Sequence, residues 1–250
     1  MLDVAIDAAK AGGELALKYF KSHPKVSYKA DKTPVTRADI EAEKLIRKII
    51  TKKFPDHGII GEELPPVNPK ARYQWVIDPI DGTKSFVRRM PFWSTLLALM
   101  ENGKPIIGIS FSPVDNELFT AEKGKGTFLN GKRQRVSKVS ELQNAYLAHG
   151  SIDAFENKNM LNGFIKLYRA TGSHRGFGDS YAYHLLIKGN IDIMVEAKDK
   201  VHDIAAPAIL IEEAGGKFTD FSGKFSLTSD CGVVTNKILH SQVLKLLNGK

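Results

Sequence analysis

The N-terminal part of the chain carries apolar residues at helical spacing. The pattern runs over residues 3–21 and again over residues 37–54, where Pro55 ends it. Each segment keeps charged residues opposite its apolar face, as an amphipathic helix does. We therefore predict two helices that each bury one face against a core.

From residue 74 the pattern changes to short β-rich runs. Polar turn sequences such as ENGK and SPVDN separate these runs and predict an antiparallel meander. The expected strands span residues 74–78, 94–100, 105–111, 117–122 and 126–129.

After residue 140, strand-like and helix-like segments alternate, which is typical of layered α/β structure. We expect an N-terminal α+β lobe over residues 1–140 and a C-terminal α/β lobe over residues 141–250. Their boundary lies in the polar, basic stretch at 135–145. The second lobe is expected to contain strands at 144–150, 190–196, 217–221 and 232–236, and helices near 156–169, at 179–189, at 203–216 and from about 237.

Composition places the chain among ordinary globular proteins. Its 250 residues, 42% hydrophobic and 26% charged, can bury a substantial core. The single cysteine, Cys231, cannot form an intrachain disulfide, and the N-terminal segment lacks the pattern of a signal peptide. The apolar runs are shorter than the roughly 18 residues of a membrane span. We therefore expect a soluble, cytoplasmic protein with no membrane partner.

The net charge of +8 raises the question of a nucleic-acid ligand. The lysines and arginines are dispersed among acidic residues, and no stacking-aromatic motif accompanies them. We therefore expect no nucleic-acid partner. A basic field also attracts small phosphorylated substrates.

The clearest candidate chemistry lies at residues 75–86, where an apolar strand runs into Asp78 and Asp81. With a proline between them restricting the backbone, both carboxylates and the carbonyl of Ile80 can point into one small volume. Such oxygen donors suit hard cations, magnesium above all. The alternative is an ordinary Asp-Gly-Thr turn, in which the aspartates cap the segment that follows.

Two further carboxylates favour the metal interpretation. Glu62 follows an apolar pair at the end of a predicted strand, and Asp203 precedes an apolar helical run. Each has a structural alternative. Glu62 could face solvent, and Asp203 could be the N-cap of a helix that has Pro207 near its first turn.

Four segments together resemble the inositol monophosphatase-like family of metal-dependent sugar phosphatases, in the same order and over nearly the whole chain. They are GEE at 61–63, WVIDPIDGTKSF at 75–86, GKGTFLNGK at 124–132 and VHDIAAPAILIEEAGG at 201–216. The resemblance implies a layered α/β/α/β/α sandwich and a homodimer. It also implies two or three magnesium ions per subunit and sensitivity to lithium.

The resemblance implies a metal site with Asp78 as the bridging ligand. Two cations in such a site promote in-line attack of water on phosphorus. The implied ligands are Glu62, Asp78, the carbonyl of Ile80, Asp81 and Asp203.

The resemblance also implies that Thr83 and Asp39, together with Glu62, act on the attacking water. The alternative for Asp39 is a capping box with Thr36, and the alternative for Thr83 is a turn hydroxyl bonded to nearby backbone. We expect Gly82 and Thr83 to open a short helix whose backbone N–H groups bind the substrate phosphate.

Within the family, TKSFVRRMPFWSTLLALM at 83–100 and GDSYAYHLLIKG at 178–189 resemble the histidinol-phosphatase branch. A carboxylate near the leaving group would recognise its cationic amine, and Asp179, beside Ser180, and Glu196 are the candidates. The alternatives are a helix cap for Asp179 and a surface position for Glu196.

We therefore predict hydrolysis of histidinol phosphate, a small phosphorylated substrate. Inositol 1-phosphate is the nearest alternative. Fructose bisphosphate and nucleotide 3′-phosphates would use the same metal ligands.

The chain departs from the family pattern before Asp203. Where the family often has Trp-Asp, this chain has His202, preceded by the charged run 197–200. Magnesium prefers oxygen, which disfavours His202 as its ligand. Trp93 and Arg88-Arg89 could lie at the edge of the pocket. The alternative is that Trp93 packs in the core and that the two arginines face solvent.

Overall fold

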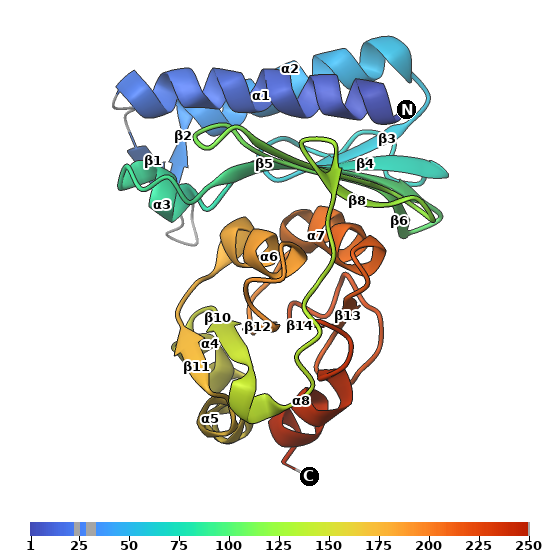
Figure 1. Cartoon of the computed structure of the whole chain (residues 1–250). Coiled ribbons are helices and arrows are strands. Elements are labelled where there is room, and N and C mark those ends of the chain that lie inside the picture. The colour runs from blue at the N-terminus through green and yellow to red at the C-terminus, as the bar shows by residue number, and fades with distance from the viewer. Residues whose placement is uncertain (23–25, 29–33, 250) are drawn as a thin grey trace.

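The computed structural model describes residues 1–22, 26–28 and 34–249 as a stack of five layers (Figure 1). Helices α1 and α2 form the outer layer on a seven-stranded sheet, and α6 and α7 separate this sheet from a five-stranded one. Helices α4, α5 and α8 cover the far side (Figure 1). The predicted α/β/α/β/α sandwich is therefore confirmed.

The two predicted N-terminal helices are present, and helices and strands follow in the predicted alternation. The helices are α1 (Leu2–Ser22), α2 (Arg37–Lys53), α3 (Thr83–Val87), α4 (Ile152–Asn157), α5 (Leu161–Ala170), α6 (Asp179–Ile187), α7 (Val201–Glu213) and α8 (His240–Leu247), with a 3-10 turn at Leu142–Asn144.

The first large sheet has the order β3-β4-β5-β6-β7-β8-β9. The pair β3–β4 is parallel, and every later pair is antiparallel, so the predicted meander is confirmed. Its strands are β3 (Gly58–Gly61), β4 (Tyr73–Asp81), β5 (Ser94–Glu101), β6 (Lys104–Ser112), β7 (Glu117–Glu122), β8 (Gly126–Leu129) and β9 (Lys132–Arg133).

The second large sheet is mixed, with the order β11-β10-β12-β14-β13. Strand β10 pairs in parallel with both neighbours, whereas β14 pairs antiparallel with β12 and β13. Its strands are β10 (Tyr146–His149), β11 (Ser173–Arg175), β12 (Ile193–Glu196), β13 (Lys217–Thr219) and β14 (Gly232–Thr235). A separate antiparallel pair joins β1 (Val26–Tyr28) to β2 (Pro34–Thr36).

Two predicted helix boundaries are wrong. The single helix expected near 156–169 is two helices, α4 and α5, because Asn159 adopts a left-handed φ of 57° that ends the first. Helix α7 begins at Val201 rather than after Asp203, so its N-cap residue is Lys200.

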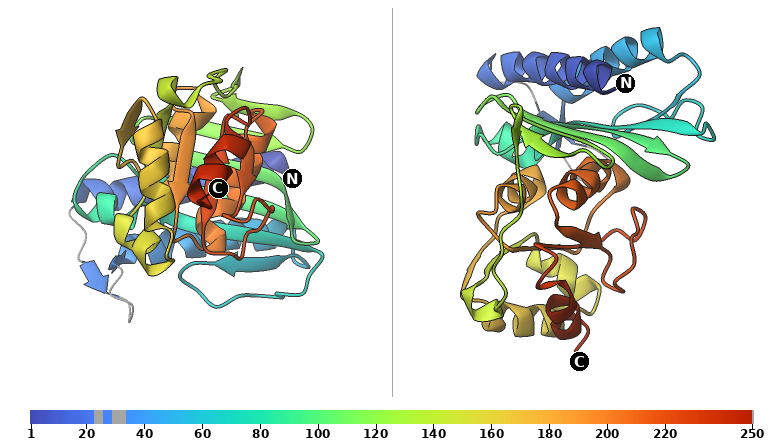
Figure 2. Two further views of the ribbon diagram at one scale, coloured as in Figure 1. Left: turned by 90° about the horizontal axis from the view of Figure 1, so that it is seen from below. Right: turned by 45° about the vertical axis from the view of Figure 1, so that its right-hand side comes forward.

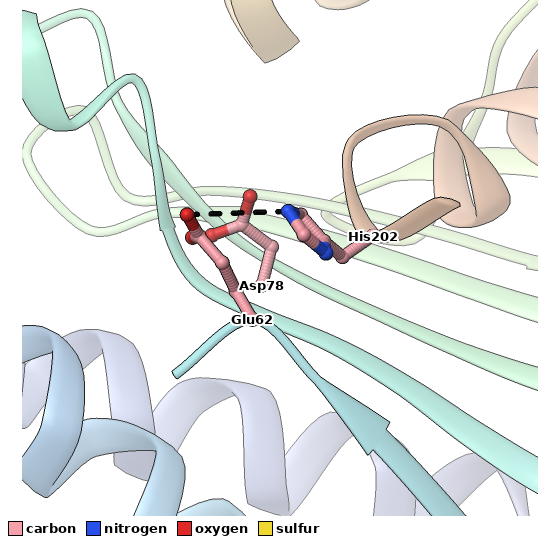
Figure 3. Close-up of side chains that lie close together, drawn as sticks. All are labelled: Glu62, Asp78 and His202. Carbon is pink, nitrogen blue, oxygen red and sulfur yellow. Dashed lines mark ion pairs between the residues drawn. The ribbon is translucent and has the colours of Figure 1, made fainter. Parts of the chain in front are cut away.

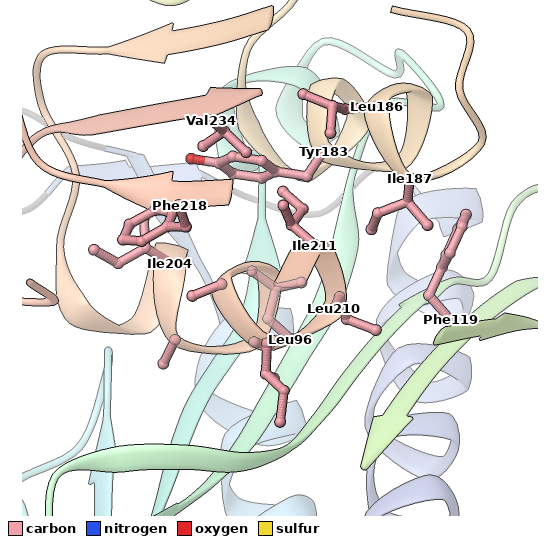
Figure 4. Packing of buried hydrophobic residues seen from close by; sticks show 14 of the residues in the cluster. Leu96, Phe119, Tyr183, Leu186, Ile187, Ile204, Leu210, Ile211, Phe218 and Val234 are labelled. Carbon is pink, nitrogen blue, oxygen red and sulfur yellow. The ribbon is translucent and has the colours of Figure 1, made fainter. Parts of the chain in front are cut away.

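One hydrophobic cluster joins the two halves of the chain (Figure 4). Leu96 and Phe119 enter it from the first sheet, Ile187 from α6, and Phe218 and Val234 from the second sheet. Helices α6 and α7 therefore share their buried faces with both sheets. The division into residues 1–140 and 141–250 stays a prediction.

The two chain ends lie at opposite ends of the stack, as a second direction of view also shows (Figure 2). Among the described residues, no helix combines the length and the apolar character needed to cross a membrane.

Helix α7 packs closely on β6 at Gly108. A Cβ atom added there would lie 2.8 Å from the carbonyl oxygen of Ala206 and 2.5 Å from Cγ2 of Ile209. The backbone of α7 cannot give way as a side chain can. Glycine therefore sets the distance between α7 and the first sheet.

We expect Gly108→Ala to lower the free energy of unfolding by about 1–3 kcal/mol, because it overpacks this contact. Urea unfolding measures the change. Gly176→Ala is the matched control, since its Cβ would meet only the His149 ring, at 3.6 Å. Equal unfolding midpoints for the two variants would contradict the argument.

Candidate active site

Strands β3 and β4 run in parallel and deliver carboxylates side by side. Gly61 pairs with Ile77, and the N–H of Glu62 donates to the carbonyl of Ile77 at 3.2 Å. Glu62 therefore follows β3 at the level of Asp78. Its side chain is 13% exposed and lines the pocket, so the solvent-facing alternative is not what the structure has.

A bulge at the end of β4 brings Asp78 and Asp81 together. Residues three apart in a regular strand point to opposite faces of the sheet. Here Asp78 pairs with Leu96 while Asp81 pairs with Ser94, so β4 has one extra residue. The N–H of Ile80 donates to Oδ1 of Asp78 at 3.0 Å, which fixes the carboxylate within the bulge.

Asp203 reaches the same place from the first turn of α7. Its Oδ2 accepts the N–H of Lys200 at 2.7 Å, so the carboxylate caps the helix from its third position. The N-cap alternative for Asp203 is thus wrong in position, although the residue does stabilise the helix start. One of its carboxylate oxygens lies within 4.8 Å of carboxylate oxygens of Asp78 and Asp81.

Four carboxylates and one imidazole form two overlapping groups. In each group the candidate ligand atoms lie within 4.8 Å of one another, and Asp78 belongs to both. Figure 3 shows Glu62, Asp78 and His202 converging from β3, β4 and α7. Asp81 and Asp203 complete the second group with Asp78.

Burial makes this arrangement electrostatically costly. Asp78 is 2% exposed and Asp81 is 6% exposed. Burial, followed by the charges of Glu62 and Asp81, raises the pKa of Asp78 well above its usual range. Burial, followed by Asp179 and Asp203, does the same for the pKa of Asp81. A divalent cation relieves both effects, so the residues fit a hard metal ion.

Asp39 lies behind the cluster, fully buried in the first turn of α2. Its Oδ2 accepts the N–H and the hydroxyl of Thr36 at 2.7 and 2.6 Å, so the capping-box alternative is present. Burial, the largest influence, raises its pKa to about 6, and the charge of Glu62 contributes to the increase. Oδ1 of Asp39 has no hydrogen-bond partner within the described ranges.

Thr83 and Gly82 begin α3 as predicted. The hydroxyl of Thr83 donates to the carbonyl of Ile80 at 3.0 Å, which is the turn alternative. Gly82 has φ 86°, and a Cβ atom there would lie 2.7 Å from the carbonyl oxygen of Phe92. Only glycine fits this turn. The roles of Thr83 and Asp39 toward water stay predictions.

A buried ion pair on α2 fixes the loop that follows Glu62. The sequence pattern does not reveal this pair. Glu43 of α2 is buried and accepts the N–H of Glu63 at 2.7 Å and that of Leu64 at 3.3 Å. Arg47 binds the same carboxylate at 2.6 Å. The sequence pattern places the charged residues of this helix, Arg47 among them, opposite the apolar face, where side chains are usually solvated. Glu43 and Arg47 instead hold the chain next to Glu62.

The carboxylates line one pocket, which also contains most of the predicted substrate residues. Asp39 and Ser180 are the predicted site residues that do not line it. The pocket is lined by Glu62, Asp78, Ile80, Asp81, Gly82, Thr83, Lys84, Asp179, Tyr183, Met194, Glu196, Lys198, Asp199, Lys200 and Asp203.

Asp179 and Ser180 start α6 in different roles. Asp179 lies at the exposed mouth of the pocket with φ 54°, the N-cap is Gly178, and no side chain caps the helix. The cap alternative for Asp179 is therefore wrong. The pKa of Asp179 is raised, chiefly because the surrounding protein removes water from the carboxyl group, and next because of the charge of Asp203. Ser180 is buried, and its N–H donates to Oδ2 of Asp81 at 2.6 Å.

Glu196 is half-buried at the end of β12, not a surface residue. Burial is the largest influence on its pKa, which is raised to about 7. Oε1 accepts the N–H groups of Ala197 and Lys198 at 2.9 and 3.3 Å. A Cβ atom at Gly150 would collide with the carboxylate, so glycine leaves room for this position of the Glu196 side chain.

Sequence reasoning missed two buried polar residues of the pocket, Asp199 and Tyr183. Asp199 is 7% exposed, and burial together with Glu196 raises its pKa well above the usual range. Oδ2 of Asp199 and the hydroxyl of Tyr183 have no hydrogen-bond partner in the part of the chain that the structure describes. The charged run 197–200 is the one sequence signal that could have pointed to Asp199.

Trp93 and the two arginines do not line the pocket. Trp93 is 1% exposed and packs against Phe20 and Phe86, with ring centroids 5.6 and 5.0 Å away. Arg88 and Arg89 are exposed. The core and solvent alternatives are therefore correct for these residues.

Comparison with known proteins agrees with the fold. The profile described as "Inositol monophosphatase family" matches residues 1–250. The chain belongs to the inositol monophosphatase family.

Two curated relatives illustrate the range of activities in this family. A histidinol-phosphatase of Mycobacterium tuberculosis is 36% identical over 229 residues, covering 90% of this chain and 88% of that protein. A fructose-1,6-bisphosphatase/inositol-1-monophosphatase of Thermotoga maritima is 36% identical over 251 residues, covering 99% and 95%. Among solved family structures, a Thermotoga maritima IMPase has a TM-score of 0.87 and 34% identity, covering 99% of this chain and 96% of that one.

Removing one carboxylate tests the electrostatic argument. We expect Asp78→Asn to raise the melting temperature in EDTA by about 2–4 °C, which corresponds to about 1 kcal/mol, because less like charge is buried. Magnesium should raise the melting temperature of the wild type but not of the variant. Thermal unfolding with and without magnesium measures both, with the exposed Asp115→Asn as control. The same magnesium response in Asp78→Asn would contradict the assignment.

The raised pKa of Asp39 predicts a pH dependence of stability. The folded state holds this proton more tightly than the unfolded state, so the free energy of unfolding of the metal-free protein falls as pH rises from about 4 to about 6. The difference between 3.8 and about 6 corresponds to about 3 kcal/mol. Asp39→Asn keeps an acceptor for the cap and should lose this part of the pH dependence.

Urea unfolding in EDTA across this pH range measures the effect of Asp39. Asp56→Asn, on the surface, is the control and should follow the wild type. If Asp39→Asn also follows the wild type, the buried carboxyl does not titrate as argued.

Proposed function

We propose that this protein is a magnesium-dependent phosphomonoesterase that hydrolyses histidinol phosphate to histidinol and phosphate. The observation that carries the proposal is one pocket in which a cation-binding carboxylate cluster lies beside a second acidic group. The carboxylate cluster would hold the cations that act on the phosphate. The second acidic group would bind a positively charged alcohol.

The metal part of the proposal uses residues that already converge. Two or three magnesium ions would be held by Glu62, Asp78, the carbonyl of Ile80, Asp81 and Asp203, with Asp78 shared between both groups. When bound, such ions supply Lewis-acid chemistry, lowering the pKa of a water and offsetting the charge on the leaving oxygen.

The chain itself positions the reactants. Asp39 and Thr83 would orient the attacking water. Asp39 would act through Oδ1, which has no hydrogen-bond partner among the described residues, and Thr83 through its hydroxyl. The backbone at Gly82, where no side chain intervenes, would let the phosphate approach closely. The ammonium of Lys84, also in the pocket, adds positive charge there.

The alcohol side of the pocket favours an amine-bearing leaving group. Asp179, Glu196 and Asp199 place three carboxyl groups there. Oε1 of Glu196 is bound to backbone N–H groups, whereas no hydrogen bond within the described chain uses Oε2. An ammonium group would pair with such carboxylates and offset their mutual repulsion.

Inositol 1-phosphate is the second candidate substrate. The curated Thermotoga maritima relative bears that activity in its name, at the same identity as the Mycobacterium tuberculosis histidinol-phosphatase. Its alcohol is neutral and does not require three carboxyl groups. We further propose a cytoplasmic homodimer inhibited by lithium, on the basis of the family resemblance.

Phosphate release from L-histidinol phosphate and from inositol 1-phosphate, side by side with magnesium and with an EDTA control, tests the proposal. We expect turnover of histidinol phosphate to exceed that of inositol 1-phosphate and to vanish in EDTA. Faster release from inositol 1-phosphate would overturn the substrate assignment. No release from either substrate would overturn the activity.

Neutralising the alcohol side should separate the two substrates. We expect Glu196→Gln to lower kcat/KM for histidinol phosphate about 10–100-fold, because it loses a charged hydrogen bond of about 1.5–3 kcal/mol. Any rate on inositol 1-phosphate should change less than about threefold by the same reasoning. Glu141→Gln, at an exposed site outside the pocket, is the control. Equal losses on both substrates would contradict amine recognition.

A further inference from the structure

His202 brings a nitrogen atom into the carboxylate cluster. Its Nε2 lies 3.5 Å from Oδ1 of Asp203 and 3.9 Å from Oε1 of Glu62, and the residue is 9% exposed. Figure 3 shows the imidazole facing Glu62 and Asp78 from the start of α7. A ligand atom of each of these three residues lies within 4.8 Å of the other two.

These separations suit ligands around one ion. Atoms bound at about 2.1 Å to an octahedral cation are about 3 Å apart in neighbouring positions and about 4 Å apart in opposite ones. A cation between the three groups would therefore contact all of them with little movement.

The two overlapping groups differ in their chemistry. Asp78, Asp81 and Asp203 offer only oxygen, whereas the other group combines two carboxylates with an imidazole. Imidazole nitrogen suits zinc, copper, iron and nickel, whereas magnesium prefers oxygen. The imidazole nitrogen therefore lets the position between Glu62, Asp78 and His202 discriminate between divalent ions. The oxygen-only position lacks this feature.

The start of α7 holds the imidazole in this position. Lys200 N–H binds Asp203, which fixes the first helical turn that carries His202. The apolar side of the same helix packs on the first sheet. The donor is therefore supported by the fold, rather than placed on a free loop.

We propose that His202 coordinates, through Nε2, the cation that Glu62 and Asp78 hold, and that this position consequently binds zinc or a similar transition ion more tightly than magnesium. The oxygen-only position keeps its affinity for magnesium. The inference rests on the cation site of the proposed function, but not on the identity of the substrate.

The first test is spectroscopic. With one equivalent of Mn²⁺, the metal-free protein should show electron spin-echo modulation from a directly bound imidazole nitrogen. Replacing ¹⁴N-histidine by ¹⁵N-labelled histidine should change this modulation and so identify the nitrogen as that of a histidine. His202→Gln should lose this signal. His57→Gln should keep it, because the imidazole of His57 lies outside the pocket, where it accepts a hydrogen bond from Trp75. A wild-type spectrum without imidazole coupling overturns the proposal even if the variant does not fold.

The second test compares affinities by calorimetry. We expect His202→Gln to weaken the first Zn²⁺ binding about tenfold or more, and Mg²⁺ binding less than about threefold, since one nitrogen ligand is lost. His202→Trp, with the residue that the family often has, should behave like His202→Gln. Parallel losses for both ions would overturn the proposal, because His202 would then act only by shaping the pocket.

These readouts do not depend on phosphatase activity. Imidazole coupling in a protein that releases no phosphate would support the inference and contradict the proposed function. Turnover with magnesium but no imidazole coupling would give the opposite result.

Discussion

The mutual repulsion of buried carboxylates at the end of β4 is the constraint on which the site depends. Asp78 and Asp81 are nearly inaccessible to water, and Asp203 faces them from α7. Water cannot screen charges in such a place, so a cation is the natural partner. The acidic cluster therefore has the chemistry of a cation site.

Hydrophobic packing holds these carboxylates together. Helix α7 lies between the two sheets and contributes apolar residues to the cluster that also contains Leu96 and Phe218. The contact of Gly108 with the backbone of α7 sets how closely the helix approaches. The apolar core thus supplies the free energy that keeps like charges near one another, an arrangement typical of functional sites that reduce stability.

Two aspartates combine a structural and a chemical position. Asp39 and Asp203 are each the third residue of a helix and each accept the N–H of the residue that caps it. One oxygen of each is used by the helix. The charge of Glu62 acts on Asp39, and a carboxylate oxygen of Asp203 lies within 4.8 Å of Asp78 and Asp81. A capping interaction therefore does not argue against a role in the site, because it fixes the direction of the carboxylate.

The sequence by itself determined the N-terminal helices and the meander, because periodicity is a local property. Its short motifs, through their resemblance to a family, also implied the layered sandwich and the full set of metal-binding candidates. It could not decide that a bulge brings Asp78 and Asp81 to one side, since a strand alone would separate them. Nor could it place His202 beside Glu62, or bury Asp199 in the pocket. Only the tertiary structure decided these contacts, because they join segments whose distance depends on how α7 packs between two sheets.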